Sequence, residues 1–175
     1  MLTLLLGGAR SGKSALAVEM GRRHEGPVAF IATSEPLDAD LTARIDRHRG
    51  DRPDWPIVEE PLDLAGALTG PGADALVIVD CLTVWVSNLM HRGDTDAAIE
   101  ARSAEAARLA VGRAAPTVVV SNEVGLGVHP ETALGLRYRD VLGRVNQQWA
   151  AVADRSLLLV AGRALTLIDP WGVLA

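Results

Sequence analysis

The sequence predicts an α/β fold in which a mostly parallel sheet carries helices on both faces. Short apolar runs alternate with longer helical patterns along the chain, and this order is typical of β-α-β units with right-handed crossovers. The apolar runs are nearly continuous rather than alternating, as expected of strands that are covered on both faces. The length of 175 residues suits one domain, spanning residues 1–175.

Five apolar runs predict strands because Gly, Pro or Asp bounds them and most are rich in Leu and Val. They are Leu2–Leu6, Val28–Ala32, Ala75–Val79, Thr117–Ser121 and Ser156–Ala161. Ala164–Ile168 is a candidate final strand, since Gly162-Arg163 suggests a tight hairpin. This hairpin would add an antiparallel strand to an otherwise parallel sheet.

Helices are expected between the strands, over Ser14–His24, Asp38–Arg49, Leu62–Leu68, Asp96–Arg113 and Thr132–Ala153. In the second helix, His48 continues the apolar stripe of Leu41 and Ile45. The fourth helix is rich in alanine and amphipathic, and Asp94 or Thr95 is its candidate N-cap.

The first strand leads into a glycine-rich loop that matches the P-loop pattern G-x-x-x-x-G-K-[ST]. Its residues are Gly7, Gly8, Ala9, Arg10, Ser11, Gly12, Lys13 and Ser14, and all are predicted to bind a nucleotide. Backbone N–H groups and the following helix N-terminus form a nest for phosphates in such loops. We expect Lys13 to reach the β- and γ-phosphates and the Ser14 hydroxyl to hold Mg²⁺. The predicted fold is therefore a RecA-like P-loop NTPase.

The composition points to the same lysine. Lys13 is the only lysine in the chain, and the other sixteen Lys/Arg positions are arginine. Arginine can replace most surface lysines, but a planar, forked guanidinium cannot replace a compact ammonium that fits between phosphates. Lys13 is therefore predicted to be catalytic.

Asp80 directly follows the buried run Ala75–Val79 and is a candidate for the carboxylate on the Mg²⁺ side of the site. An acid at that strand end would lie beside the P-loop and order metal-bound water. The alternative is a solvated carboxylate that opens the next turn.

The segment from Arg44 to Pro53 surrounds one histidine, His48, with four arginines. Neighbouring cations disfavour imidazolium, which would keep His48 neutral and nucleophilic, and the same cations would bind phosphates. A neutral imidazole beside a triphosphate could attack phosphorus and form a covalent intermediate. The alternative is that His48 only completes the apolar stripe as a packed side chain.

The segment from Ser121 to Pro130 follows a buried strand at its carboxyl end, where open α/β sheets bind ligands. Asn122 and Glu123 could face the nucleotide or a second substrate, or the segment could be an ordinary turn. The following helix offers Arg137, Arg139, Asp140 and Asn146, which could extend this wall or form a solvated face.

The net charge, the cysteine count and the hydropathy of the chain exclude several classes of protein. The net charge of −5 argues against a general nucleic-acid binder. The one cysteine, Cys81, excludes an internal disulfide and fits the cytoplasm. No apolar run is long enough to span a membrane, and we find no secretory signal. No His/Cys/Asp cluster has the spacing of a transition-metal site.

Seven motifs in order resemble one family. They are GGARSGKS, IATS (Ile31–Ser34), RIxxHRxxRPxxW (Arg44–Trp55), VEE (Val58–Glu60), VDCLTxWxxNL (Val79–Leu89), SNEVGxGxxP (Ser121–Pro130) and RxxxGRVNQ (Arg139–Gln147). This order resembles the bifunctional adenosylcobinamide kinase / adenosylcobinamide-phosphate guanylyltransferase family of cobalamin biosynthesis. The resemblance runs from Leu4 to about Gly162.

The resemblance implies roles for particular residues. The P-loop of the family matches Gly7–Ser14, and its guanylylated histidine matches His48. Further nucleotide contacts are implied at Ala32, Thr33, Ser34, Arg49, Gly50, Asp51, Arg52, Glu59 and Asp80. Some members carry Glu at the place of Asp80.

The resemblance also implies two reactions. ATP or GTP, with Mg²⁺, would phosphorylate adenosylcobinamide; His48 would then take GMP from GTP and pass it to adenosylcobinamide phosphate. Family members are similar in forming homotrimers. Two rivals are a plain P-loop small-molecule kinase, which needs no histidine nucleophile, and a RecA-like motor or regulatory ATPase, for which we see no partner surface.

Overall fold

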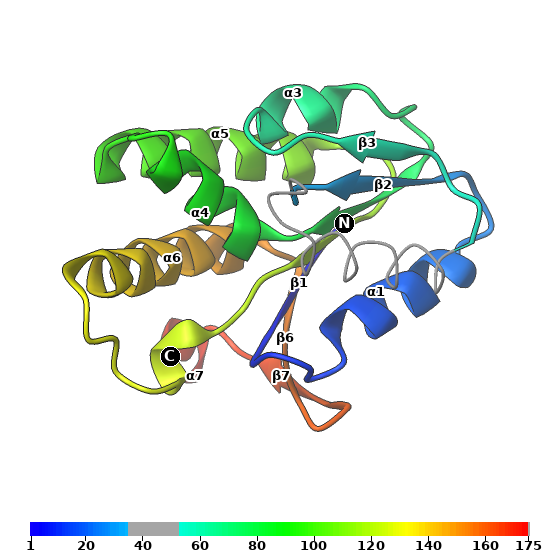
Figure 1. Ribbon diagram of the computed structural model, residues 1–175. Coiled ribbons are helices and arrows are strands. Elements are labelled where there is room, and N and C mark those ends of the chain that lie inside the picture. The colour runs from blue at the N-terminus through cyan, green and yellow to red at the C-terminus, as the bar shows by residue number, and fades with distance from the viewer. Residues whose placement is uncertain (35–52, 175) are drawn as a thin grey trace.

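The computed structural model describes residues 1–34 and 53–174 of the chain, and one sheet of seven strands runs through it (Figure 1). The strand order is β3-β2-β4-β5-β1-β6-β7. The strands are β1 (Leu2–Gly7), β2 (Val28–Ala32), β3 (Ile57–Glu59), β4 (Leu76–Asp80), β5 (Thr117–Val120), β6 (Arg155–Val160) and β7 (Arg163–Leu167). All neighbours pair in parallel except β6 and β7, which pair antiparallel. The predicted mostly parallel sheet and its C-terminal hairpin are confirmed.

The helices are α1 (Lys13–Arg22), α3 (Leu64–Thr69), α4 (Leu82–His91), α5 (Asp96–Gly112), α6 (Ala133–Val152) and α7 (Pro170–Val173). A short 3₁₀ turn, η1, covers Val124–Leu126. Side-chain caps explain where two helices begin. The hydroxyl of Thr95, one of the two candidate caps, accepts from the Ala98 N–H, and the Asp63 carboxylate, which was not predicted, accepts from the Gly66 N–H. The helix predicted over Asp38–Arg49 lies outside the described residues.

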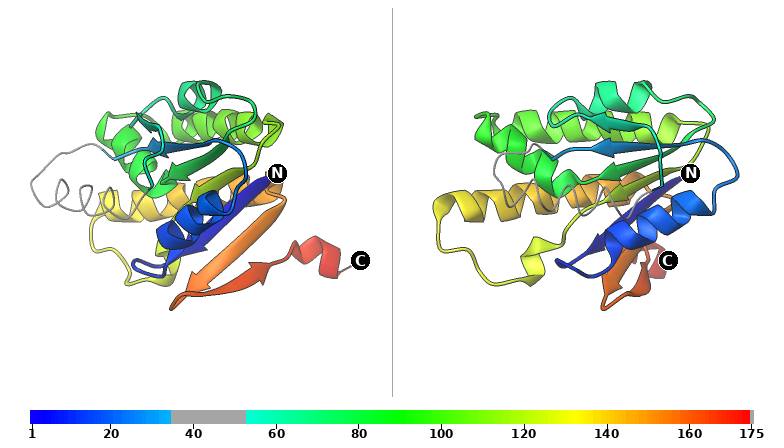
Figure 2. Two further views of the ribbon diagram at one scale, coloured as in Figure 1. Left: turned by 90° about the vertical axis from the view of Figure 1, so that its right-hand side faces the viewer. Right: turned by 45° about the vertical axis from the view of Figure 1, so that its right-hand side comes forward.

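The sheet separates two hydrophobic cores. Leu4, Ile31 and Val79 pack beneath α3, α4, α5 and α6 on one face. Leu5 and Phe30 point to the other face, where α1 lies. Successive strand residues therefore enter different cores, which is why the strand sequences are continuously apolar. Figure 2 shows the helices on the two sides of the sheet.

Three elements were not predicted. Helix α4 follows β4 at once, and Leu82, Trp85 and Leu89 on it are buried. Its N-cap, Cys81, makes no side-chain cap bond, so no cap residue marked the start of this helix. Strand β3 has only three residues and is largely exposed, and α7 has only four residues.

Candidate functional site

Several of the predicted nucleotide contacts lie on one row across the sheet. The parallel registers pair Leu5 with Val120, Val120 with Asp80, Asp80 with Ala32, and Ala32 with Glu59. This row is at the carboxyl edge of the strands, where open α/β sheets bind ligands. The P-loop leaves the same edge from Gly7, the last residue of β1.

Backbone conformation makes two P-loop glycines necessary. Gly7 and Gly12 have φ of 149° and 102°, values that side chains rarely allow. A Cβ on Gly7 would also collide with the Leu159 carbonyl oxygen and lie 2.8 Å from Ser11 Oγ. The loop can therefore lie tightly against β6 only with glycine at this position.

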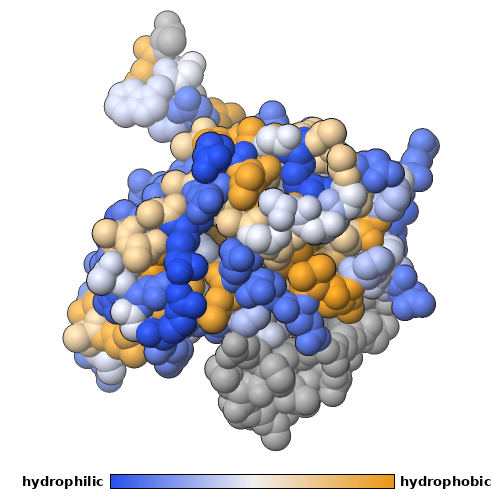
Figure 3. All heavy atoms as spheres, turned by 90° about the horizontal axis from the view of Figure 1, so that it is seen from above, coloured by the Kyte–Doolittle hydropathy of each residue, from blue (hydrophilic) through white to orange (hydrophobic). Residues whose placement is uncertain are grey.

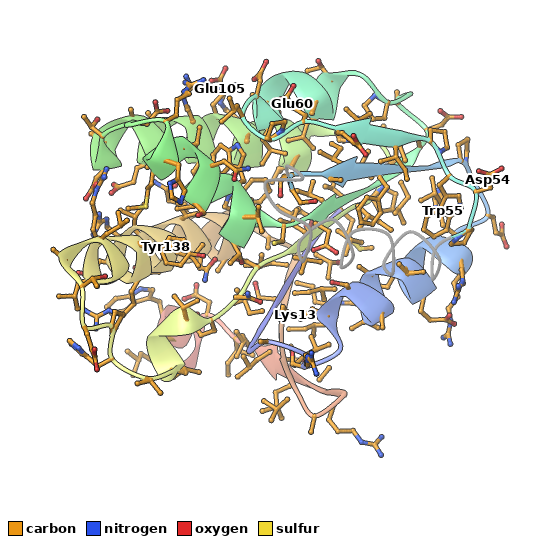
Figure 4. All side chains as sticks on the ribbon, viewed as in Figure 1. Lys13, Asp54, Trp55, Glu60, Glu105 and Tyr138 are labelled. Atoms are coloured by element: carbon orange, nitrogen blue, oxygen red, sulfur yellow. The ribbon has the colours of Figure 1, made fainter. Side chains whose placement is uncertain are left out.

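Lys13 opens α1 and is only 6% exposed (Figure 4). Its Nζ donates to the Gly7 carbonyl at 3.0 Å, to the Gly8 carbonyl at 2.7 Å and to Ser11 Oγ at 3.4 Å. The ammonium is thus held inside the loop that is predicted to wrap a triphosphate.

Charge around Lys13 connects β4 to the P-loop. Burial lowers the pKa of Lys13, whereas Cys81 and Asp80 raise it. Burial, with the nearby Asp80 charge, also raises the pKa of the Cys81 thiol to about 12, so Cys81 is neutral near pH 7. The charge that raises the pKa of Lys13 is therefore that of the Asp80 carboxylate at the end of β4. This agrees with the predicted position of Asp80 beside the P-loop.

Two further segments contact the P-loop, and only the second of them, the loop after β5, was a candidate for the nucleotide site in the sequence. The β6–β7 turn reaches it through the Gly162 N–H, which donates to the Ser11 carbonyl at 2.9 Å. The loop after β5 reaches it through the Glu123 N–H, which donates to the Gly7 carbonyl at 3.1 Å. Both contacts use backbone groups, so residue types gave little indication of them; Gly162 was identified only as a turn residue.

The four polar residues of α6 that could either extend the site beside the loop after β5 or form a solvated face separate into two groups. Asn146 is buried and its Nδ2 donates to the Asn122 carbonyl at 3.0 Å, so it does support this loop. Arg137 instead donates to Asp96 on α5 at 2.6 Å. That hydrogen bond lowers the pKa of Asp96. Arg139 and Asp140 pair with each other at 2.9 Å.

Thr33 is fully buried behind the sheet edge. Its hydroxyl accepts from the Cys81 N–H at 2.9 Å and donates to the Cys81 carbonyl at 2.8 Å. Its own carbonyl accepts from Asn88 Nδ2 at 2.7 Å. Thr33 thus connects the loops after β2 and β4, while its neighbours Ala32 and Ser34 border the same edge.

The loop after β3 carries two adjacent acids. Glu59 is exposed at the end of the strand, on the shared register row. The Glu60 side chain binds the residues that follow it: its Oε1 accepts from the Leu62 and Asp63 N–H groups at 2.9 and 2.8 Å. Glu60 therefore organises the entry to α3, and Glu59 lies at the sheet edge.

The resemblance assigns the nucleophile and several nucleotide contacts to the arginine-rich patch around His48. His48, Arg49, Gly50, Asp51 and Arg52 lie outside the described residues. The chain is next described at Pro53, and the nearby Trp55 packs on α1, where a Cβ on Gly21 would lie 2.5 Å from its ring. Figure 4 shows Trp55 at the far end of α1 from Lys13.

In residues 1–34 and 53–174, no three His, Cys, Asp or Glu side chains gather as metal ligands. Within the same ranges, no helix is long and apolar enough to cross a membrane.

Comparison with known protein families shows which family this chain is related to. Residues 3–167 match the model of the cobinamide kinase / cobinamide phosphate guanyltransferase family. The chain belongs to this family. Among relatives of this kinase/guanyltransferase family, the bifunctional adenosylcobalamin biosynthesis protein CobU of Escherichia coli is 42% identical over 178 residues, which cover 93% of this chain and 97% of the relative. CobP of Pseudomonas aeruginosa, with the same description, is 40% identical over 95% of this chain and 97% of its own length.

Solved structures support the fold of this family member. An ATPase of the type III secretion system of pathogenic bacteria aligns with a TM-score of 0.58 over 99% of this chain and 60% of its own. A protein of Pyrococcus horikoshii OT3 aligns with a TM-score of 0.57 over 97% of this chain and 88% of its own. Both are only 8% identical, so they show the fold alone, and that fold agrees with the predicted α/β P-loop class.

Proposed function

We propose that this member of the cobinamide kinase / cobinamide phosphate guanyltransferase family carries out both reactions in its name. It phosphorylates adenosylcobinamide with ATP or GTP. It then transfers GMP from GTP, through a GMP-histidine at His48, to adenosylcobinamide phosphate, which gives adenosylcobinamide-GDP and pyrophosphate. The observation that carries the proposal is the buried Lys13 ammonium, held by a P-loop at the sheet edge of a chain that belongs to this family.

In the kinase reaction, the aminopropanol hydroxyl of adenosylcobinamide attacks the γ-phosphorus of the nucleotide, and the nucleoside diphosphate leaves. Lys13 and the backbone N–H groups of Gly8–Ser14 bind the β- and γ-phosphates and spread the developing charge. Ser14 and Asp80 supply the hard oxygen ligands that suit Mg²⁺. When bound there, Mg²⁺ neutralises phosphate charge.

In the transferase reaction, the neutral His48 imidazole attacks the α-phosphorus of GTP, and pyrophosphate leaves. The phosphate oxygen of adenosylcobinamide phosphate then attacks the same phosphorus, and His48 leaves as the free imidazole. The P-loop holds the triphosphate tail in both reactions. Ala32, Thr33, Ser34, Arg49, Gly50, Asp51, Arg52, Glu59 and Asp80 are proposed to border the nucleotide.

Trapping the covalent intermediate tests this mechanism. Protein incubated with GTP labelled in the α-phosphate and then denatured should carry acid-labile, alkali-stable label, whereas GTP labelled in the γ-phosphate should leave none. His48→Asn should abolish the label and keep the kinase reaction. A plain kinase or a motor ATPase would take up no label. Label on His48→Asn equal to that on the native chain would show that another residue is the nucleophile.

We further propose a homotrimer located in the cytoplasm. The single cysteine suits a reducing compartment. Exposed apolar side chains on β7 and the segment after it, among them Leu165 and Ile168, offer a surface for a second copy. Light scattering coupled to size-exclusion chromatography tests the trimer: a monomer at micromolar concentration would refute it.

A further inference from the structure

We infer that Thr83 and Asn146 are positioning residues that hold the loop after β5 against the P-loop and thereby set the affinity for the triphosphate. This inference rests on the proposed function, since it concerns how the same site binds its nucleotide. Neither residue lies in the P-loop or on the register row of the sheet edge. Both act through one residue of the loop, Asn122.

The first step is the contact between the loop and the P-loop. The Glu123 N–H donates to the Gly7 carbonyl at 3.1 Å. The same oxygen accepts from Lys13 Nζ at 3.0 Å. Two donors from different parts of the chain thus fix one carbonyl, and the orientation of that carbonyl sets the peptide plane that carries the Gly8 N–H. Gly8 belongs to the predicted phosphate nest.

The second step is what holds the loop. Asn122 lies beyond the end of β5, and side chains from two helices bind both of its backbone groups. Its N–H donates to Thr83 Oγ1 on α4 at 2.7 Å, and its carbonyl accepts from Asn146 Nδ2 on α6 at 3.0 Å. Asn146 Oδ1 accepts from the Ser121 hydroxyl at 2.6 Å, which fixes the amide in the orientation that donates to Asn122.

The third step is the cost of this arrangement. Thr83 is 8% exposed and Asn146 is 4% exposed. Buried polar side chains are costly to desolvate, and a hydrophobic side chain of similar size would pack between these helices without that cost. Tyr138 adds a further bond, from its hydroxyl to the Thr83 carbonyl at 3.1 Å, and Figure 4 shows it on α6 facing α4. These polar groups hydrogen-bond to the loop that contacts the P-loop or to the residue that holds it. Apolar side chains could pack there but could not fix the position of the loop through directional hydrogen bonds.

Removing one of the hydrogen bonds that hold Asn122 should therefore weaken binding of the phosphates and leave binding of the nucleoside unchanged. Thr83→Val keeps the shape of the side chain and removes the acceptor for the Asn122 N–H, whereas Thr83→Ser keeps the acceptor. We expect Thr83→Val to raise the Kd for GTP about three- to tenfold, the range that loss of one hydrogen bond gives. Thr83→Ser should bind GTP like the native chain. Binding of guanosine, which lacks the phosphates, should be the same in all three, as measured by calorimetry.

A matched control separates positioning from general stability. Ser103 is buried between α5 and α6, and its hydroxyl accepts from Trp149 Nε1 at 3.2 Å. Ser103→Ala removes a comparable buried hydrogen bond without touching the loop. It should lower the thermal midpoint and leave the Kd for GTP unchanged. Asn146→Asp, which keeps the acceptor for Ser121 and loses the donor to Asn122, is a second variant and should weaken GTP binding as Thr83→Val does.

The measurements separate a failure of the positioning role from a failure of the proposed function. If the native chain binds no GTP, the proposed function fails and this inference fails with it. If the native chain binds GTP and Thr83→Val binds it as tightly as Thr83→Ser, only the positioning role is refuted. Equal weakening of GTP binding by Ser103→Ala would also refute it, because the effect would then follow stability alone.

Discussion

At the scale of single residues, the Lys13 ammonium has three hydrogen-bond donors and three acceptors around it. The Gly7 carbonyl, the Gly8 carbonyl and Ser11 Oγ lie at 3.0, 2.7 and 3.4 Å from Nζ. A point-like ammonium suits such a tight cradle, whereas a guanidinium presents its donors in a flat fork. Burial lowers the pKa of Lys13 and the Asp80 charge opposes that effect, so the two influences act against each other at this residue.

Lys13→Arg should consequently disable both reactions although it preserves the charge. We expect the rates of adenosylcobinamide phosphorylation and of GMP-histidine formation each to fall about 100-fold or more, as when a preorganised donor to the transition state is lost. Arg23→Lys is the control, because Arg23 caps the opposite end of α1, is exposed and pairs with Glu19 at 2.7 Å. It should leave both rates unchanged. Survival of both activities in Lys13→Arg would refute the steric argument.

At the scale of elements, the packing of α1 depends on the absence of a side chain. A Cβ on Gly21 would lie 2.5 Å from the Trp55 ring and 3.1 Å from Ile78 Cδ1. The ring of Trp55 therefore covers α1 at this glycine and joins the core of which Phe30 and Ile78 are part. Because Trp55 follows the segment that contains His48 in the sequence, this packing fixes the chain just beyond that segment.

Gly21→Ala tests this packing. Alanine normally stabilises a helix interior by about 0.5–1 kcal/mol relative to glycine. Here the overlap with Trp55 should dominate, since overpacking costs about 1–3 kcal/mol, and the free energy of unfolding should fall. Gly143 on α6 is the control, because a Cβ there meets nothing within 4 Å. Urea unfolding should show Gly143→Ala at or above native stability. If Gly21→Ala gains stability as well, the Trp55 packing is wrong.

Elements also differ in how far the sequence could predict them. The strands β1, β2, β4 and β5 were evident because buried parallel strands are continuously apolar. Burial also concealed α4, because most of its residues are buried, including the polar Thr83 and Asn88, and no side chain caps its N-terminus. The P-loop residues and Asp80 could be predicted from residue type at a strand end, whereas Ala32–Ser34 and Glu59 were implied only by the family resemblance. The contacts made by Gly162 and Glu123 use backbone groups, so only the folded arrangement brings them to the P-loop.

At the scale of the whole molecule, the C-terminal hairpin is both an edge of the sheet and a neighbour of the site. β7 is the last strand in the order and is exposed along its length. The segment after it projects from the body (Figures 2 and 3). Leu165 is 60% exposed and Ile168 is 70% exposed. An exposed edge strand with apolar side chains is a surface that natural proteins cover, and a second copy of the chain would cover it here.

Charged substitutions on this hairpin should therefore dissociate the proposed trimer. Leu165→Lys combined with Ile168→Lys should shift the mass measured by light scattering from trimer to monomer, because buried unpaired charges oppose association. Val111→Lys is the control, since Val111 is also exposed but lies on α5, which packs against α3, α4 and α6. The Gly162 N–H connects the hairpin turn to the Ser11 carbonyl at 2.9 Å, so the dissociated variant should also bind GTP more weakly. A variant that remains trimeric would place the interface elsewhere; a monomer with native GTP affinity would show that the hairpin turn does not couple assembly to the P-loop.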